Sequence, residues 1–312
     1  MSTIRTRMAG AFYAASLWSG HGLRRAKALR APRILMYHGV APDELSAELF
    51  DWQISFLQNE FDLVSLPTLL QRRSTGQLTG EEVAVTFDDG VCNHVTAVYP
   101  MLQQRRAPAT FFVCPGLVDS GRWIWNMELR CRLRLLSDSE LKTLAAEIGA
   151  DSAGIEALVQ HAKSFGLAQR TEFERRVQER TSQFSPSFAQ FDRFAPASWG
   201  QLEKLDPSLI TIGSHTLTHP ILTTLTTENL QVEIGESRRL LEQRLQRPVD
   251  LFCYPNGDND TRAQAEVRRH YSAAVTTVAG ALSAEDDDCL LPRIPAGRTR
   301  GLFMRRMYRH TA

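Results

Sequence analysis

Short apolar runs alternate with segments of helical spacing along most of the chain. Uncharged apolar runs predict buried strands, whereas apolar residues three and four positions apart predict amphipathic helices. Strands are predicted at residues 34–38, 61–64, 83–87, 109–113, 209–212, 249–254 and 273–277, and residues 290–295 form the last core segment. Helices are predicted at residues 49–57, 66–70, 94–104, 199–205, 227–246 and 263–271. This alternation is typical of βα units that build a parallel sheet.

One long stretch interrupts the alternation. Residues 119–195 are rich in Leu, Ala, Glu and Arg, show helical periodicity around 128–146 and 154–183, and contain no predicted strand. We therefore predict a helical insertion at about 119–195 within a domain that spans residues 34–297. A chain of 312 residues is long enough to bury a large core of this kind.

Charge is unevenly distributed, although the net charge is only +1. Residues 1–33 contain six Arg and one Lys, residues 293–312 contain six Arg, and neither stretch contains an acid. We predict a basic amphipathic segment at 1–33 and a basic tail at 298–312. These ends are either solvated or in contact with phosphates, acidic glycans or anionic lipid. The small net charge gives no general basis for nucleic-acid binding.

The compartment is indicated by three features of the sequence. No stretch approaches the roughly 20 apolar residues that cross a bilayer. Residues 8–18 are compatible with a short signal segment, but the basic residues that follow suit an amphipathic surface helix better. The five Cys form no close-spaced pair, which disfavours disulfides and a cysteine zinc site. We expect a cytoplasmic protein, or one peripheral to the inner membrane, with secretion as the less favoured alternative.

The clearest polar motif directly follows the predicted strand 83–87. Asp88 and Asp89 are adjacent, and Gly90 releases the backbone into a turn. Neighbouring carboxylates raise each other's pKa, and a bound cation would relieve that cost. One carboxylate would then bind the metal while the other stays free as a base. The alternative is a turn or helix cap made of two solvated acids.

A second polar motif follows the predicted strand 209–212. His215 and His219 are four residues apart, a spacing that lets two imidazoles converge on one ion. Taken alone, such a pair is more often two surface or core histidines. In a barrel of parallel strands, however, the C-terminal strand ends share the face that carries the active site. One carboxylate and two imidazoles would there form a three-ligand metal site with open positions.

These motifs resemble those of the polysaccharide deacetylases of carbohydrate esterase family four, which share the NodB homology domain. Residues 86–90 and 214–219 are similar to the first two family motifs, and residues 252–257 to the third, in a variant that ends Pro-x-Gly. Residues 35–38 and 291–295 are similar to segments of one bacterial branch. The resemblance covers about residues 33–118 and 196–297. It implies a distorted (β/α) barrel with about seven parallel strands.

The resemblance also implies roles for the matching residues. Asp88 would be the general base that activates water. Asp89, His215 and His219 would hold a divalent metal, most often zinc. The oxyanion would lie between the metal and a backbone N–H in the turn at 255–257, expected to be that of Asn256.

The predicted substrate contacts come from three places in the chain. They are His38 after the first strand, Tyr254 and Pro255 in the third motif, and Trp123 and Trp125 at the start of the insertion. The two tryptophans either line a sugar site or belong to a hydrophobic core.

Two departures from the family pattern concern the catalytic groups. The Arg that orients the base in the third motif is replaced by Cys253, and Arg293 is the candidate substitute, with a structural ion pair as its alternative role. The family's general-acid His has no counterpart near 290–297, which leaves His38 and His94 as candidates.

The sequence thus predicts a metal-dependent hydrolase that removes N-acetyl groups from a sugar, a lipid-linked glycan or a polysaccharide. The alternatives are a related amidohydrolase with another acyl substrate and a catalytically silent glycan-binding protein that contacts a membrane through its basic ends.

Overall fold

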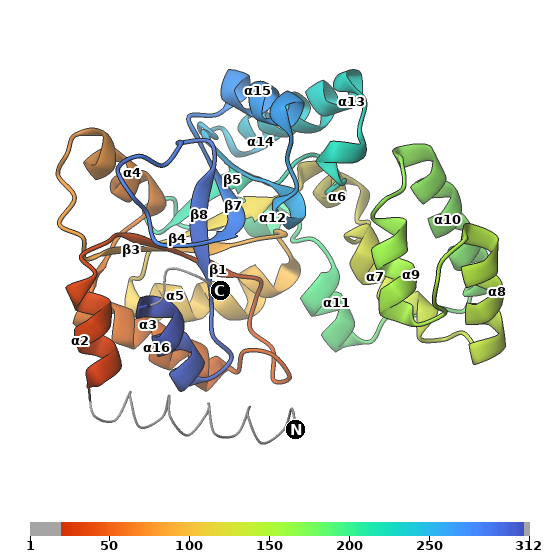
Figure 1. Cartoon of the computed structure of the whole chain (residues 1–312), viewed down its shortest axis with the longest axis horizontal. Coiled ribbons are helices and arrows are strands. Elements are labelled where there is room, and N and C mark those ends of the chain that lie inside the picture. Colours follow the sequence, from red (N-terminus) through yellow and green to blue (C-terminus); the bar gives the residue numbers. More distant parts are fainter. Residues whose placement is uncertain (1–19, 309–312) are drawn as a thin grey trace.

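A closed barrel of parallel strands forms the centre of the computed structural model, which describes residues 20–308 (Figure 1). The strands are β1 (Arg33–Tyr37), β2 (Asp62–Leu63), β3 (Glu82–Phe87), β4 (Ala109–Val113), β5 (Ile210–Ser214), β6 (Leu251–Cys253), β7 (Ala273–Ala279) and β8 (Leu291–Pro295). The sheet runs β1-β8-β7-β6-β5-β4-β3 and closes where β1 pairs with β3, while the two residues of β2 pair with the start of β3. The prediction of a distorted barrel with about seven parallel strands is confirmed.

Helices surround the barrel. Most of them lie between successive strands, while one precedes β1 and one follows β8. They are α2 (His21–Ala28), α3 (Ala47–Glu60), α4 (Leu66–Ser74), the π-helix η1 (His94–Val98) continuing into α5 (Tyr99–Arg105), α12 (Trp199–Leu202), η2 (Leu222–Thr224), α13 (Thr227–Gln231) continuing through the π-helix η3 (Val232–Glu236) into α14 (Ser237–Leu245), η4 (Pro255–Gly257), α15 (Thr261–His270) and α16 (Arg300–Tyr308). Among these described helices, none combines the length and apolar character that a membrane crossing needs.

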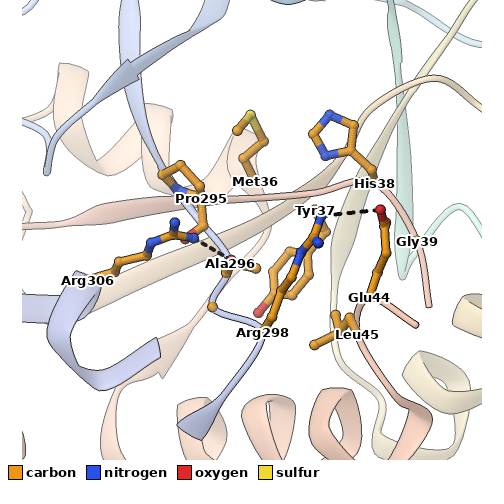
Figure 2. Close-up of a pocket in the computed structure, with 11 residues that line it drawn as sticks. Met36, Tyr37, His38, Gly39, Glu44, Leu45, Pro295, Ala296, Arg298 and Arg306 are labelled. Carbon is orange, nitrogen blue, oxygen red and sulfur yellow. Dashed lines mark hydrogen bonds and ion pairs between the residues drawn. The ribbon is translucent and has the colours of Figure 1, made fainter. Parts of the chain in front are cut away.

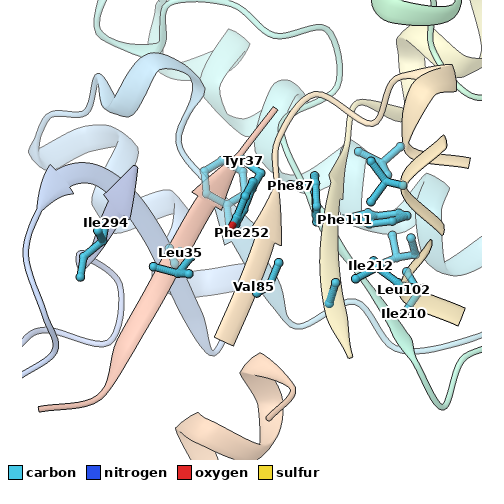
Figure 3. Close-up of a cluster of buried hydrophobic side chains, with 14 of the residues drawn as sticks. Leu35, Tyr37, Val85, Phe87, Leu102, Phe111, Ile210, Ile212, Phe252 and Ile294 are labelled. Carbon is cyan, nitrogen blue, oxygen red and sulfur yellow. The ribbon is translucent and has the colours of Figure 1, made fainter. Parts of the chain in front are cut away.

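Two hydrophobic layers hold the barrel together because successive side chains of a strand point to opposite faces. The outer layer packs strand residues against the surrounding helices, and Figure 3 shows Leu35, Val85 and Phe87 projecting into it from neighbouring strands. The alternate residues, among them Ala84 and Phe112, form a second cluster inside the barrel. All six residues of β3 are buried, which explains the uncharged run from Val83 to Phe87 that leads up to the two aspartates.

The helical insertion forms a separate layer beside the barrel, drawn in green in Figure 1. Its helices are α6 (Pro115–Ser120), α7 (Trp125–Leu133), α8 (Asp138–Ile148), α9 (Ile155–Ala162), α10 (Leu167–Arg180) and α11 (Phe188–Phe194). They bury a cluster of their own, which includes Leu144, Leu158 and Val177. No residue from 119 to 195, all of which are described, belongs to a strand, as the sequence predicted.

The described parts of the two basic ends meet at one side of the barrel, where α16 (Arg300–Tyr308) packs against α2. The segment 298–312, which we predicted as a basic tail, contains the helix α16, and Phe303, Met304 and Met307 on it are buried. The guanidinium of buried Arg33 donates to the carbonyls of Met307 and Ala26, which ties α16 to α2. The described part of this segment is therefore packed into the barrel rather than forming a tail. Residues 1–19 and 309–312 lie outside the described part, so membrane contact through the basic N-terminal segment stays a prediction.

Candidate active site

The polar residues singled out in the sequence gather where the barrel strands end. Asp88 and Asp89 follow β3, His215 and His219 follow β5, and Arg293 lies on β8. Gly90 closes the turn after the aspartates at φ +64°, and a Cβ there would lie 2.9 Å from the Cα of Val113 on β4. A glycine is therefore required at this turn, both for the backbone conformation and for the close approach of two strands.

Three buried side chains from two of these strand ends converge on one point. The Oδ1 of Asp89 lies 3.5 Å from the Nε2 of His215 and 3.6 Å from the Nε2 of His219. These separations are long for hydrogen bonds. Two ligand atoms about 2.1 Å from one ion, at a near-tetrahedral angle, are about 3.4 Å apart. The spacing of the three atoms is thus that of a metal-ligand set.

Hydrogen bonding leaves a lone pair of His215 available to a metal. Its Nδ1 lies 2.7 Å from the carbonyl oxygen of Cys253. Because a carbonyl only accepts, Nδ1 carries the proton and Nε2, facing Asp89, carries the lone pair. The Nδ1 of His219 is buried and has no hydrogen-bond partner among residues 20–308. The donor set of one carboxylate and two imidazoles suits a divalent ion such as zinc.

A second group of possible ligands, Asp88, His215 and Cys253, also lies close together. Its atoms are already engaged, because Asp88 is paired with Arg293 and the Nδ1 of His215 donates to the Cys253 carbonyl. Burial also raises the pKa of the Cys253 thiol, which disfavours the thiolate that a metal requires. The set containing Asp89 is therefore the better metal site.

The loop that carries both histidines is held in an unusual backbone conformation. Thr216 has φ 67° and His219 has φ 59°, values that non-glycine residues adopt only when the surroundings impose them. Buried Glu233, on the π-helix η3, accepts from the backbone N of Thr218 at 2.8 Å and from its Oγ1 at 2.5 Å. The Glu233 carbonyl also accepts from the N of Leu217 at 2.9 Å. Glu233 thus fixes the loop from behind, a role that the sequence analysis did not assign.

Asp88 forms a buried ion pair with Arg293 inside the barrel. The guanidinium donates to Oδ1 at 2.6 Å and to Oδ2 at 2.7 Å, and it also donates to the carbonyl of Thr276 at 2.8 Å. Burial by itself would raise the pKa of Asp88, but the charge and hydrogen bonds of Arg293 lower it to about 2. The neutral thiol of Cys253 lies 3.2 Å from the same guanidinium. Arg293 from β8 therefore pairs with Asp88, while Cys253 of the third motif contributes a neutral thiol beside the pair.

The two histidines considered as proton donors lie in different environments. His94 is 1% exposed, packs against Phe87 and Phe111, and places its Nε2 3.1 Å from the His38 carbonyl. Burial lowers the pKa of His94 to about 4, so it is a neutral core residue. His38 is exposed and lines the pocket above Asp89.

The third motif contributes one residue to the pocket. Asn256 lines it and has φ 54° within the turn η4. Tyr254 is fully buried and packs edge-on against Phe252, and Pro255 is buried as well. The structure therefore places Tyr254 and Pro255 in the core under the turn, where they support Asn256 instead of facing a substrate.

The pocket next to Asp89 has a volume of about 560 Å³, and the insertion forms one of its walls. The barrel side contributes His38, Asp89, Val91, Asn256 and neighbouring loop residues, whereas the insertion side contributes Ile124, Asn126, Met127, Arg130, Arg134, Glu156, Lys163, Arg193 and Phe194. Trp123 packs against Phe184 and Phe194, and Trp125 lies under Arg170 in the core of the insertion. Both tryptophans are thus buried, and Ile124 and Asn126 beside them face the pocket.

A second pocket of about 380 Å³ adjoins the first at the ends of β1 and β8. The two pockets share His38, Glu44 and Arg298. Figure 2 shows Arg298 and Glu44 meeting across this boundary, and their ion pair measures 3.2 Å. The open space beside the candidate metal site therefore continues past the surface ion pair between Arg298 and Glu44.

Comparisons with known proteins point to one family. A family model for polysaccharide deacetylases matches residues 75–275. The Bacillus subtilis protein YxkH, provisionally named a polysaccharide deacetylase, is 30% identical over 95 residues, which are 30% of this chain and 34% of YxkH. The chain thus spans about a third of the length of the curated relative that it matches.

Two solved structures share the fold. A Streptococcus pyogenes deacetylase, PplD, in complex with acetate has a TM-score of 0.61 at 18% identity and covers 89% of this chain and 98% of its own. IcaB from Ammonifex degensii also has a TM-score of 0.61 at 18% identity, over 89% of this chain and 97% of its own. At this identity the likeness concerns the fold alone.

Proposed function

The chain belongs to the polysaccharide deacetylase family, and from that premise we propose that it is a metal-dependent hydrolase that removes N-acetyl groups from a sugar or polysaccharide. The observation that supports this most directly is the arrangement after β3 and β5. Three ligand atoms of Asp89, His215 and His219 share one point, while the carboxylate of Asp88 beside them is left over. A divalent ion held there would polarise the acetyl carbonyl and acidify a water.

Asp88 is the proposed general base. Its pKa of about 2 keeps it ionised at neutral pH, and each carboxylate oxygen bound to Arg293 retains a lone pair that can accept a proton. Water gives one proton to Asp88 as its oxygen adds to the acetyl carbon. The C–N bond then breaks as the nitrogen takes up a proton, which leaves acetate and a free amine. Arg293 holds the carboxylate in one orientation and so acts as a positioning residue.

The departing amine needs a proton, and we assign that role to His38. Among the described residues other than the two proposed ligands, it is the one histidine that lines the pocket. His94 holds the backbone of His38 from below through the bond to its carbonyl. The Asn256 backbone N–H is the proposed donor to the oxyanion, since the turn η4 places this residue in the same pocket as Asp89.

The test combines metal analysis with acetate release from N-acetylglucosamine oligomers. The purified protein is expected to contain about one divalent ion per chain and to lose activity on chelation. Asp88→Asn should retain the ion and lose at least about 100-fold in kcat. Asp89→Asn should lose the ion as well. The control is Asp151→Asn, because Asp151 is exposed and has no ion pair within residues 20–308.

Two results would count against this function. A protein that binds no divalent metal removes its basis, and full activity of Asp88→Asn removes the assigned base. For His38, the expected result in His38→Gln is a lower kcat with unchanged metal content. An unchanged pH–rate profile in that variant would show that another group delivers the proton.

A further inference from the structure

The pocket beside Asp89 is lined by more positive than negative side chains, and most of the positive ones belong to the wall that the insertion contributes. Five cationic side chains line the pocket, namely Arg130, Arg134, Lys163, Arg193 and Arg298. Apart from the proposed ligand Asp89, three acidic side chains line it, namely Asp43, Glu44 and Glu156. The excess of positive charge faces the space where a substrate must lie.

Ion pairs engage all three of these carboxylates. Glu156 accepts from the Nε of Arg130 at 2.9 Å and from its Nη2 at 3.0 Å. Arg193 pairs with Asp43 at 2.8 Å and with Glu44 at 2.7 Å. Arg298 shares Glu44 at 3.2 Å. Three of the five cations therefore have their partners within the pocket wall.

The other two cations, Arg134 and Lys163, have no such partner. Within residues 20–308 neither side chain takes part in an ion pair or a hydrogen bond. Both are near Glu156, whose pKa is lowered mainly by the hydrogen bond from Arg130 and further by the charges of Arg134 and Lys163. Lys163 is also near Asp258, whose pKa burial raises while the Lys163 charge opposes the rise, yet the two form no ion pair.

This arrangement leaves two positive side chains free to bind a ligand. The carboxylate of Glu156 already forms a two-pronged pair with Arg130, so the charges of Arg134 and Lys163 are only partly balanced within the pocket wall. A guanidinium fork beside an ammonium is a combination that binds carboxylate or phosphate oxygens well. The positive potential of the pocket would also draw in an acidic substrate.

We propose that Arg134 and Lys163 form a subsite for an anionic group of the glycan substrate, a carboxylate or a phosphate. The inference rests on the proposed function, because it assumes that the acetylated sugar occupies the pocket beside Asp89. The N-acetyl group lies at the barrel side, and the anionic group of the same or the next unit lies against α7 and the end of α9. The substrates are therefore acidic N-acetylated glycans.

Binding measurements test the subsite without any turnover. Two matched probe pairs are used on metal-free protein at low and high NaCl by calorimetry: chitotetraose against a hyaluronan tetrasaccharide, and N-acetylglucosamine against its 1-phosphate. The acidic member of at least one pair should bind about tenfold or more tightly, and high salt should reduce the difference. The pair with the larger difference identifies the source as a carboxylate or a phosphate.

A double variant locates the effect. Arg134→Gln/Lys163→Gln should bind the acidic probe about as weakly as its neutral partner. The control Lys142→Gln/Lys204→Gln removes the same charge from exposed positions outside the pocket and should keep the preference. The proposal is overturned if neither acidic probe binds more tightly than its neutral partner, or if the Arg134/Lys163 variant keeps the preference.

Acetate release then separates this inference from the function on which it rests. If the metal-loaded protein releases no acetate from any probe while the preference in binding depends on Arg134 and Lys163, the proposed function fails and the subsite stands. If it releases acetate from both members of each pair with equal kcat/KM, and binding shows no preference either, the function stands and the subsite fails. The expected result is a higher kcat/KM for the acidic probe, lost in the Arg134/Lys163 variant.

Discussion

The barrel and the helical insertion form opposite walls of one pocket, and they are built in different ways. On the barrel side, Asp88 is 3% exposed and Arg293 is fully buried, and hydrogen bonds hold both in place. On the insertion side, Arg134 is exposed and Lys163 is half-buried, and neither is held by a partner among the described residues.

This difference separates two tasks. Buried polar groups are costly to rearrange, so the barrel side fixes the positions of the reacting atoms. Exposed charged residues on the insertion can be substituted without disturbing the barrel, because the insertion has a hydrophobic core of its own. We therefore expect substitutions in the barrel to alter turnover for every substrate, and substitutions on the insertion wall to alter the choice of substrate.

The largest effect is expected from Arg293→Met. The change leaves Asp88 as a buried charge without its partner, which should lower the free energy of unfolding by about 3–5 kcal/mol. Loss of the fixed carboxylate orientation should lower kcat by about 100-fold with little change in KM. Chemical unfolding and acetate-release kinetics measure the two effects.

Two further variants check that explanation. Asp88→Asn/Arg293→Met removes the unpaired charge and should regain part of the stability while remaining inactive. Arg268→Met removes an exposed guanidinium that pairs with Asp287, and should change stability by less than about 1 kcal/mol. An Arg293→Met protein of normal stability would show that the pair with Asp88 does not anchor the barrel centre.

The next effect concerns pH and the buried His94. Its pKa is about 4 in the folded protein because of burial, against about 6.5 in an unfolded chain. As the pH falls from 6.5 to 4, His94 binds a proton in the unfolded state but not in the folded state. The free energy of unfolding is therefore lower at pH 4 than above pH 6.5, by about 3 kcal/mol.

His94→Gln isolates this contribution because glutamine does not titrate and can still donate to the His38 carbonyl. Chemical unfolding is measured for both proteins from pH 7 to pH 4. The difference in unfolding free energy between wild type and His94→Gln should shrink as the pH falls. Parallel curves would mean that His94 has the same pKa in the folded and the unfolded protein, so that burial does not hold it neutral.

A smaller effect is expected from Glu233, which supports the loop that carries the proposed ligands His215 and His219. Glu233→Ala removes both acceptors of Thr218, so the strained loop at 215–219 loses its support. Partners of this kind typically contribute 10- to 100-fold to metal affinity, and a loss at the lower end of that range is expected. Metal titration with a competing chelator measures it.

Glu236→Ala is the matched control for this loop. Glu236 lies on the same π-helix, is about half exposed and pairs with Arg239. It should leave metal affinity unchanged. Glu233→Gln retains an acceptor for the Thr218 N–H and should regain most of the affinity. Equal metal affinity in the Ala variants of Glu233 and Glu236 would show that the loop holds its conformation alone.

The sequence was informative where local pattern and structure coincide. The apolar run before Asp88 predicted both the buried strand β3 and the position of the carboxylates at its end. The spacing of His215 and His219 after a strand predicted that the two imidazoles converge, and the family resemblance named Asp89 as the carboxylate that joins them. The strand and the pair of histidines are local features, whereas the meeting of Asp89 with the histidines follows from the parallel barrel, which places the ends of β3 and β5 on one face.

Prediction was limited where distant segments decide the environment. Nothing near His94 in the sequence shows that Phe87 and Phe111 enclose it. Which face of α7 meets the pocket depends on how the whole insertion docks, so Asn126 and Arg130 were missed. A signal for α16 was present in the spacing of Phe303, Met304 and Met307, but the arginines around them obscured it.

The smallest effect is expected at the start of the insertion, where a buried residue and a residue that lines the pocket are close neighbours in the chain. Trp125 is 4% exposed and packs under Arg170, whereas Met127, two residues later, lines the pocket. Trp125→Phe should lower stability by about 1 kcal/mol because it leaves a small cavity and a weaker cation–π contact. It should leave kcat/KM within about twofold, since the ring does not reach the pocket.

Met127→Ala is expected to show the reverse pattern, with a higher KM and nearly unchanged stability, because its side chain is half-buried on the pocket wall. Thermal unfolding and acetate release on both variants decide the matter. If Trp125→Phe instead raised KM tenfold at unchanged stability, the indole would be in contact with the sugar. The insertion would then bind substrate through its buried aromatic residues, and the separation between buried residues that stabilise the insertion and pocket residues that select the substrate would be wrong.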